Sequence, residues 1–218
     1  LLEGFHLIEE AASSDAEIKE LFVTQRGMKE WGDWLAVNKE ISTFLVSDEV
    51  MTAMSDLPTP QGILAVMTLT SKDTPDFSGG WLLLDNVQDP GNVGTMIRTA
   101  DAFGMAGVLL GKGTADIYST KVLRSMQGSN YHLPVLQKDL AEVIPVMKGK
   151  GFTVYGTELN EEAHALDKVE KTEDFAIIMG NEGQGVSQEI LSLTDQNVYI
   201  PMKGNAESLN VGVAAGIV

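Results

Sequence analysis

Residues 84–104 read LDNVQDPGNVGTMIRTADAFG, where an apolar strand ends, a Pro-Gly turn follows and a helix starts near Asn92. Backbone amides at the start of such a helix face outward at the carboxyl end of the strand, where open α/β sheets bind ligands. Arg98 follows Asn92 by six residues, close to two helical turns, so we expect both side chains on one face. Taken alone, this stretch favours the simpler interpretation of a solvent-exposed Arg98 and of Asn92 as the helix N-cap.

The chain from Trp81 onward alternates strand-like and helix-like segments. Short apolar runs predict strands at residues 81–84, 108–110, 135–136, 152–155, 175–179 and 198–200. The segments between them predict helices at residues 93–103, 119–126, 140–148, 187–193 and 208–218. This alternation predicts an α/β fold with a mostly parallel sheet and helices on both of its faces.

The first third of the chain has the composition of a separate, smaller α/β domain. An amphipathic opening segment is followed by helix-like or strand-like segments at residues 18–24, 31–37, 41–46, 48–54 and 62–69. Residues 70–80 supply turn residues and have little to bury, so we predict a linker there between a domain at 1–69 and a domain at 81–218. Leu1 lies inside a helix entry and Val218 inside an apolar helical run, so we expect both domains to be trimmed at their outer ends.

Composition excludes several classes of protein. With 44% hydrophobic residues among 218, the chain can form one large core or two small ones. No apolar run approaches the roughly 20 residues of a membrane helix, and the first residues lack the features of a signal peptide, so we expect a cytoplasmic protein without membrane contact. The absence of cysteine excludes disulfides and a thiolate nucleophile, and three distant histidines predict no metal site. A formal charge of −16 disfavours binding of a polyanion by the whole surface, so any nucleic-acid contact must be local.

A second loop, IIMGNEGQGVS at residues 177–187, follows an apolar strand. Three glycines within six residues permit a strained turn and let a ligand approach the backbone closely. The loop matches neither the phosphate-binding Gly-Lys-Ser/Thr pattern nor the G-x-G-x-x-G pattern of dinucleotide-binding proteins. The alternative is an ordinary tight turn in which Glu182 is merely solvated.

A third loop, VYIPMKGNAESLNVGVAA, spans residues 198–215. Pro201 ends a strand, the chain turns at Gly204 and Asn205, and Ser208 is placed to cap a helix of small apolar residues. Small residues allow another backbone to pack closely. The simpler alternative is that Ser208 is only a cap and Asn210 only a polar residue of the first turn.

The three loops together are far more specific than any one of them. In order and spacing, N-x-G-x-x-x-R-T-A-x-x-F-G, G-N-E-G-x-G and I-P-M-x-G-x-x-x-S-L-N-V resemble the SpoU family of RNA 2′-O-ribose methyltransferases, within the SPOUT superfamily. The resemblance covers residues 81–218, and residues 1–69 more loosely resemble the small RNA-binding domain, similar to ribosomal protein L30e, that often precedes it. It implies a mostly parallel sheet whose last helix passes through a loop to form a trefoil knot, a rare exception among folds.

The resemblance also implies a site, a cofactor and partners. The positions that match the catalytic motifs are Asn92, Arg98, Glu182, Ser208 and Asn210. The positions implied to contact S-adenosyl-L-methionine are Thr157, Gly180, Asn181, Gly185, Ile200, Met202 and Leu209. Family members are homodimers that pair through the knotted domain, and their substrate is structured RNA, either rRNA or tRNA. The chain departs from the family at Gly212, where many members have serine.

These expectations lead to a specific functional hypothesis, the transfer of a methyl group from S-adenosylmethionine to a ribose 2′-hydroxyl of RNA. A guanidinium has a pKa above about 12, so we expect Arg98 to hold phosphate and ribose rather than to act as a base. Alternatives are a methyltransferase of the same fold that acts on a base, a non-catalytic RNA-binding or ribosome-assembly factor with this fold, and a dinucleotide-binding α/β protein. The intact motifs disfavour the non-catalytic alternative.

Overall fold

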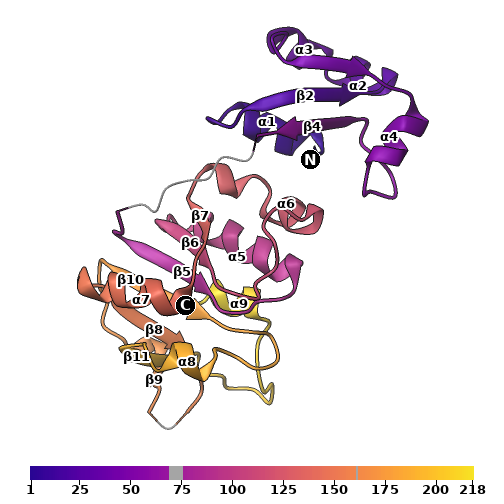
Figure 1. Cartoon of the computed structure of the whole chain (residues 1–218). Helices are drawn as coiled ribbons and strands as arrows, with labels where there is room; N and C mark the ends of the chain where they lie inside the picture. Colours follow the sequence, from indigo (N-terminus) through magenta and orange to yellow (C-terminus); the bar gives the residue numbers. More distant parts are fainter. Residues whose placement is uncertain (69–75, 161) are drawn as a thin grey trace. The chain divides into compact units, whose positions relative to one another are not determined.

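The computed structural model describes residues 1–68, 76–160 and 162–218, and the chain divides into two compact units, Leu1–Ser71 and Lys72–Val218 (Figure 1). The predicted linker at 70–80 falls largely on residues outside this description, since only residues 76–80 of it are included.

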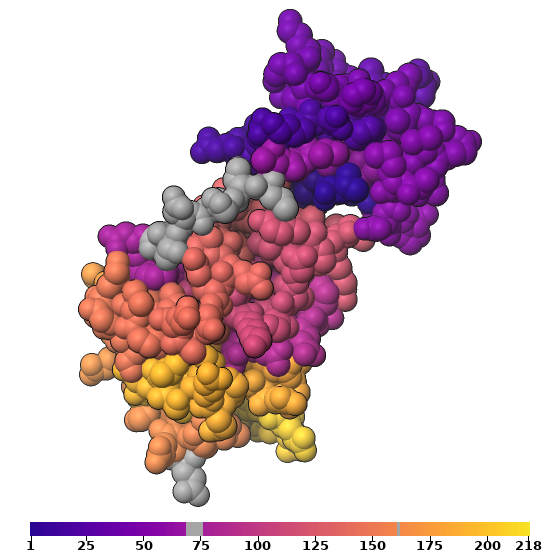
Figure 2. Space-filling model, viewed as in Figure 1, coloured from indigo at the N-terminus to yellow at the C-terminus, as the bar shows by residue number. Residues whose placement is uncertain are grey.

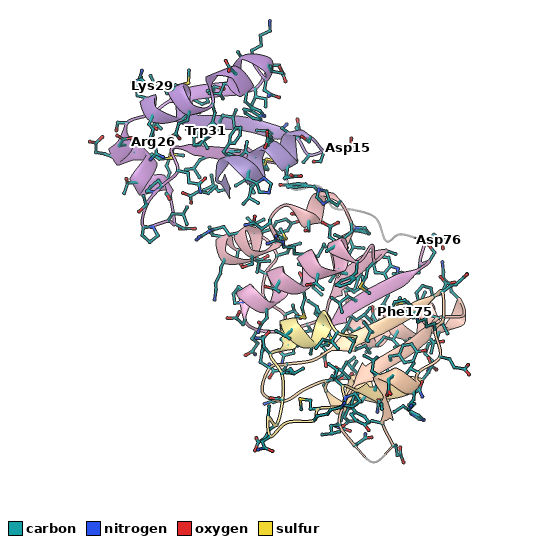
Figure 3. All side chains as sticks on the ribbon, turned by 180° about the vertical axis from the view of Figure 1, so that it is seen from behind. Asp15, Arg26, Lys29, Trp31, Asp76 and Phe175 are labelled. Atoms are coloured by element: carbon teal, nitrogen blue, oxygen red, sulfur yellow. The ribbon has the colours of Figure 1, made fainter. Side chains whose placement is uncertain are left out.

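The first unit is a four-stranded sheet with helices, as its segments predict. Its elements are β1 (Leu2–Glu3), α1 (Phe5–Ala12), β2 (Ile18–Val23), α2 (Gln25–Glu30), α3 (Gly32–Val37), β3 (Ser42–Leu45), α4 (Asp48–Met54) and β4 (Ile63–Met67), with strand order β1-β4-β2-β3. Strand β4 is antiparallel to β1 and β2, whereas β2 and β3 are parallel. Trp31, labelled in Figure 3, stacks on Phe5 with 5.1 Å between the ring centroids. This contact joins the start of α3 to the start of α1.

The second unit is built on a seven-stranded sheet with the order β7-β6-β5-β10-β8-β11-β9, in which every neighbouring pair is parallel. The predicted α/β class with a mostly parallel sheet is therefore confirmed. Its strands are β5 (Gly80–Leu84), β6 (Gly107–Leu110), β7 (Val135–Gln137), β8 (Thr153–Thr157), β9 (His164–Ala165), β10 (Phe175–Met179) and β11 (Gln196–Tyr199). Its α-helices are α5 (Pro90–Ala102), α6 (Thr120–Met126), α7 (Leu140–Gly149), α8 (Gln188–Leu191) and α9 (Val211–Ala215).

Helices cover both faces of this sheet. Trp81 and Leu83 of β5 belong to a buried cluster that includes Leu140 and Ile144 of α7 and Ile190 of α8. Side chains alternate between the two faces of a strand, so the residues between them face the opposite side, where α5 lies. Figure 1 shows α7 and α8 in front of the sheet, and the reverse view in Figure 3 shows α5 and α9 in front of it.

Two predicted helix starts are wrong, and capping explains both. Helix α5 begins at Pro90 rather than near Asn92, because the side chain of Asp89 accepts a hydrogen bond from the Asn92 amide and forms the N-cap. The last helix begins at Val211 rather than at residue 208, because Asn210 and not Ser208 is its N-cap. Residues 200–210 are therefore not helical, and they lie at the surface of the second unit (Figure 2).

Candidate active site

Close helix packing fixes the position of α5, which carries the first predicted motif. A Cβ atom on Gly94 would lie 2.3 Å from Cβ of Ser125 and 2.9 Å from the backbone of α6, so only glycine permits this approach. On another side α9 packs against α5, and a Cβ atom on Gly212 would lie 3.4 Å from Cγ2 of Thr95. The helix that carries Asn92 and Arg98 is thus held by two neighbours.

The second predicted motif forms a tight turn between β10 and α8. Asn181 and Gly185 exchange two backbone hydrogen bonds of 2.9 Å, and Asn181 Oδ1 also accepts hydrogen bonds from the amides of Gly183 and Gln184. A Cβ atom on Gly180 would lie 2.1 Å from the carbonyl carbon of Gly185, so glycine is required there by the backbone itself. The turn presents the residue at its tip, Glu182, to the start of α5.

Glu182 binds the start of α5 through three hydrogen bonds. Its Oε1 accepts from Asn92 Nδ2 and from the Asp89 amide, both at 3.0 Å, and its Oε2 accepts from the Gln88 amide at 3.2 Å. Burial raises the pKa of this carboxyl, but the hydrogen bonds from Asn92, Asp89 and Gln88 together outweigh it, and the net pKa is lowered. The carboxylate is therefore ionised at neutral pH and is a weak base. The interpretation of Glu182 as merely solvated is wrong.

The third motif joins the same site through Asn210. Its Nδ2 donates to Asn92 Oδ1 at 3.0 Å, while its Oδ1 accepts from the amides of Gly212 and Val213 at 2.9 and 3.2 Å. Asn92 thus donates to Glu182 and accepts from Asn210, and each amide group is used in its chemically required sense. We call this chain of hydrogen bonds the Glu182–Asn92–Asn210 network. It brings residues from all three predicted motifs together.

Arg98 does not join this network. It is exposed and forms no hydrogen bond or ion pair with any residue in the described parts of the chain. Six residues of α-helix turn through about 600°, so Asn92 and Arg98 leave the helix roughly 120° apart. The expectation that they share one face is therefore wrong, because α9 covers the face formed by Asn92, Thr95 and Thr99.

The cation that lies near the start of α5 is Lys121 and not Arg98. Lys121 Nζ lies 3.2 Å from Asp89 Oδ2, and the side chain of Lys121 is exposed. The hydrogen bond from the Asn92 amide lowers the pKa of Asp89, and Lys121 lowers it further. Asp89 therefore remains ionised as the N-cap of α5.

The residues expected to contact the cofactor lie in three places. Thr157 ends β8, and its hydroxyl donates to the Ile178 carbonyl at 2.7 Å. Gly180, Asn181 and Gly185 shape the turn described above. Ile200 is half-buried after β11, whereas Ser208 is exposed, as are Met202 and Leu209, which are 39% and 38% exposed.

The backbone of residues 201–209 is chemically available. All nine residues are described, and none of their backbone or side-chain groups forms a hydrogen bond with another described residue. Backbone N–H and C=O groups are strong hydrogen-bonding groups. This segment can therefore bind a polar ligand without breaking any existing bond.

Sequence reasoning missed two carboxylates of the site. Asp85 is only 8% exposed and accepts a hydrogen bond from the Ser187 amide at 2.7 Å. Asp89, the true N-cap, carried a usable signal, since an aspartate directly before proline is typical of a helix start. Asp85 carried none, because its partner lies 102 residues away in the sequence.

Within the described residues there is neither a cluster of metal-binding side chains nor a membrane-spanning helix. No group of three or more histidine, cysteine, aspartate or glutamate side chains there could hold a metal ion. None of the helices described above is long and apolar enough to cross a membrane.

Family models match both units. Residues 81–218 match the SpoU rRNA Methylase family, and residues 1–65 match the MRM3-like substrate binding domain. The chain is 42% identical over its whole length to the 23S rRNA (guanosine(2553)-2′-O)-methyltransferase RlmP of Bacillus subtilis and covers 85% of that protein.

Solved structures agree over nearly the whole chain. A crystal structure of the SpoU methyltransferase AviRb of Streptomyces viridochromogenes in complex with the cofactor AdoMet has a TM-score of 0.88 and 26% identity, covering 99% of this chain and 86% of that one. A TrmH-family structure from Porphyromonas gingivalis has a TM-score of 0.87 and 31% identity, with the same coverage. From the family match over residues 81–218 and the full-length similarity to RlmP, the chain belongs to the SpoU rRNA methylase family.

Proposed function

We propose that this protein transfers a methyl group from S-adenosyl-L-methionine to a ribose 2′-hydroxyl of ribosomal RNA. The observation that carries the proposal is the Glu182–Asn92–Asn210 network, which joins the three motifs at the carboxyl ends of the central strands β5 and β10. The relative from Bacillus subtilis carries the same activity in its name, and residues 81–218 match the SpoU family model. Ligands of open α/β sheets bind at this edge.

The residues of the second unit fit the proposed cofactor. Residues 201–209 offer unbonded backbone groups beside exposed Met202 and Leu209, which suits an adenine held by backbone hydrogen bonds between apolar side chains. We assign the same role to Ile200, to Thr157 and to the turn formed by Gly180, Asn181 and Gly185. When bound, S-adenosylmethionine supplies an electrophilic methyl group on its sulfonium sulfur.

Catalysis then depends mainly on holding the ribose hydroxyl in line with that methyl group. We assign this task to Arg98, whose planar guanidinium can donate hydrogen bonds to a phosphate and a ribose oxygen together and has no partner among the described residues. Glu182 is not the base, because its oxygens already accept three hydrogen bonds and its pKa is lowered. Ser208 and Asn210 orient the substrate, and the hydroxyl proton leaves to a substrate phosphate oxygen or to water.

We propose that the second unit is a trefoil knot and that two copies pair through it. The chain returns from β11 past β8 and β10 to place α9 on α5, a path consistent with threading through a loop. Val213 of α9 and Ile217, which follows this helix, are 54% and 48% exposed and suit an interface between copies. Pairing would offset the charge of −16 locally, because it would gather cations from two copies into one groove. These cations are Arg98, Lys112, Lys121, Arg124 and Lys203.

We assign residues 1–69 to substrate RNA binding, residues 70–80 to a linker and residues 81–218 to methyl transfer. The match of residues 1–65 to a substrate-binding family supports the first assignment. Because the substrate is ribosomal RNA, we further propose a cytoplasmic location.

The test uses the full chain, S-adenosylmethionine with an isotopically labelled methyl group, and transcribed ribosomal RNA. A 2′-O-methyl group blocks alkaline cleavage of the adjacent phosphodiester bond, so we expect label at a single nucleotide that becomes resistant to alkali. An RNA with a 2′-deoxyribose at that nucleotide is the matched control and must accept no label. Cofactor binding without any methyl transfer would instead support a non-catalytic RNA-binding factor, and label on a base would support the other class of methyltransferase.

A further inference from the structure

Two consecutive residues at the end of β5 hold both ends of the turn that carries Glu182. The Asp85 amide donates to the Met179 carbonyl at 2.9 Å, where β10 ends and the turn begins. The Asn86 carbonyl accepts from Asn181 Nδ2 at 2.9 Å. The Asp85 carboxylate accepts from the amide of Ser187 at 2.7 Å, where the turn ends and α8 begins.

Of Asp85 and Asn86, only Asp85 holds the turn through its side chain, and its partner Ser187 lies 102 residues away in the sequence. Asp85 is one of four polar or charged residues among the described ones that are buried, and it ends a strand whose residues from Trp81 to Leu84 are all buried. Ser187 is the N-cap of α8, and its side chain forms no capping hydrogen bond. Asp85 instead binds the backbone amide of this residue. A buried carboxylate is costly unless it accepts hydrogen bonds, which indicates that this contact has a purpose.

We propose that Asp85 is a positioning residue of the methyl-transfer site, acting through the turn at residues 180–187 to aim Glu182 at Gln88, Asp89 and Asn92. Without it, the far end of the turn loses the side-chain hydrogen bond that joins it, among the described residues, to the residue directly after β5. Glu182 then loses its fixed distance from the start of α5, and the Glu182–Asn92–Asn210 network loosens. The inference rests on the proposed function, which it extends to a residue outside the three motifs.

The same two strands provide a matched control at their opposite ends. Asp174 Oδ1 accepts a hydrogen bond from the Gly79 amide at 2.6 Å, directly before β10 and β5 begin. Figure 3 labels the next residue, Phe175, at this amino end of the sheet. Asp85→Ala and Asp174→Ala thus remove the same kind of bond from the same pair of strands, and only the first lies next to the candidate site.

The experiment measures backbone hydrogen exchange and S-adenosylmethionine affinity in the full chain. The amides of Gln88 and Asp89 report directly on Glu182, which holds both. In Asp85→Ala we expect these two amides to exchange at least tenfold faster and the dissociation constant to rise at least fivefold. In Asp174→Ala both quantities should stay within twofold of the wild-type protein.

Two more variants separate positioning from charge and from misfolding. Asp85→Asn keeps an oxygen that can accept from Ser187, so exchange at Gln88 and Asp89 should stay within threefold of wild type. Ser187→Pro removes the amide that donates to Asp85, at a residue whose φ of −64° matches proline. It should give the result expected for Asp85→Ala, and it keeps the test possible if Asp85→Ala does not fold.

Two results would overturn the proposal. One is wild-type protection of Gln88 and Asp89 in both Asp85→Ala and Ser187→Pro. The other is an Asp85→Asn protein as impaired as Asp85→Ala, because the carboxylate would then act by its charge. Neither readout depends on turnover, so a wild-type protein that fails to methylate ribosomal RNA would refute the proposed function alone.

Discussion

Replacing Asn92 by aspartate tests how much the Glu182–Asn92–Asn210 network stabilises the second unit. Asn92 Nδ2 lies 3.0 Å from Glu182 Oε1, and the substitution puts a second carboxylate oxygen near that position. Two charges 3 Å apart repel by about 1.4 kcal/mol in water and about 5.5 kcal/mol at an effective dielectric constant of 20. If one of the two carboxylates binds a proton, this repulsion disappears, but protonating a carboxylate at pH 7 costs about 3.7 kcal/mol. Because Glu182 is exposed, we expect Asn92→Asp to lose about 2–3 kcal/mol at pH 7.

The pH dependence gives this prediction its sign. In the wild-type protein the pKa of Glu182 is lowered by folding, so its contribution is fully present above the unfolded pKa and is lost as pH falls through the folded pKa. In Asn92→Asp the two carboxylates raise the folded pKa of the pair, so the deficit is largest above that pKa and disappears in acid. We therefore expect the difference between the two proteins to fall below about 1 kcal/mol at pH 4.

The assay is urea unfolding followed by the fluorescence of Trp81, which is 1% exposed. Trp31 and Trp34 are changed to phenylalanine in every protein, so that the signal reports the second unit alone. Asn160→Asp is the matched control, because the exposed Asn160 donates to Glu158 away from the network, and it should cost less than about 1 kcal/mol. A deficit for Asn92→Asp below about 0.5 kcal/mol at pH 7, or one unchanged at pH 4, would refute the reasoning.

Three other predictions concern substrate, turn and cofactor. Arg98→Ala should abolish most single-turnover methylation, while the free energy of unfolding changes by no more than about 0.5 kcal/mol, and Arg98→Lys should restore little activity. An Arg98→Ala protein with activity within a few-fold of wild type would exclude Arg98 from the site. Gly180→Ala places a Cβ atom 2.1 Å from the Gly185 carbonyl carbon and should cost about 3 kcal/mol in urea unfolding, whereas Gly183→Ala, with its nearest neighbour atom at 3.7 Å, should be nearly neutral. S-adenosylhomocysteine at 100 times its dissociation constant should stabilise the full chain by about 2.7 kcal/mol, seen as a raised Tm in calorimetry, and an unchanged Tm would contradict the cofactor assignment.

Most of the fold was predictable because its signals are local. The strand predicted at Phe175–Met179 matches β10 residue for residue, and the segment at 48–54, for which the pattern indicates no single element type, has the bounds of α4. Strands β1 and β9 were missed, since two residues carry no detectable period. The start of α9 was misplaced because Ser208 and Asn210 are both good N-caps, and only the tertiary bond to Asn92 distinguishes them.

The structure brings one residue of each motif together in the Glu182–Asn92–Asn210 network, but the individual contacts could not be predicted from the sequence. The motifs indicated Glu182 as a site residue without naming its partners, and the structure gives it hydrogen bonds from two backbone amides and from the side-chain amide of Asn92. The pairing of Asp85 with Ser187 left no trace in the sequence, because an acidic residue after an apolar strand is equally typical of a solvated loop. Such long-range pairings depend on strand order, which local periodicity does not determine.

The hydrogen bond between Asn92 and Asn210 determines when, during synthesis of the protein, the Glu182–Asn92–Asn210 network can be completed. Its two ends lie 118 residues apart, and at the usual rates of translation the second end appears about 6–24 s after the first. A nascent chain therefore carries Arg98, the glycine turn and Glu182 well before the residue that completes the network is made. Any chain that terminates before Asn210 lacks both α9 and its N-cap, so premature release yields a sheet without a finished site. Completion of the network is in this way tied to the translation of Asn210 and α9.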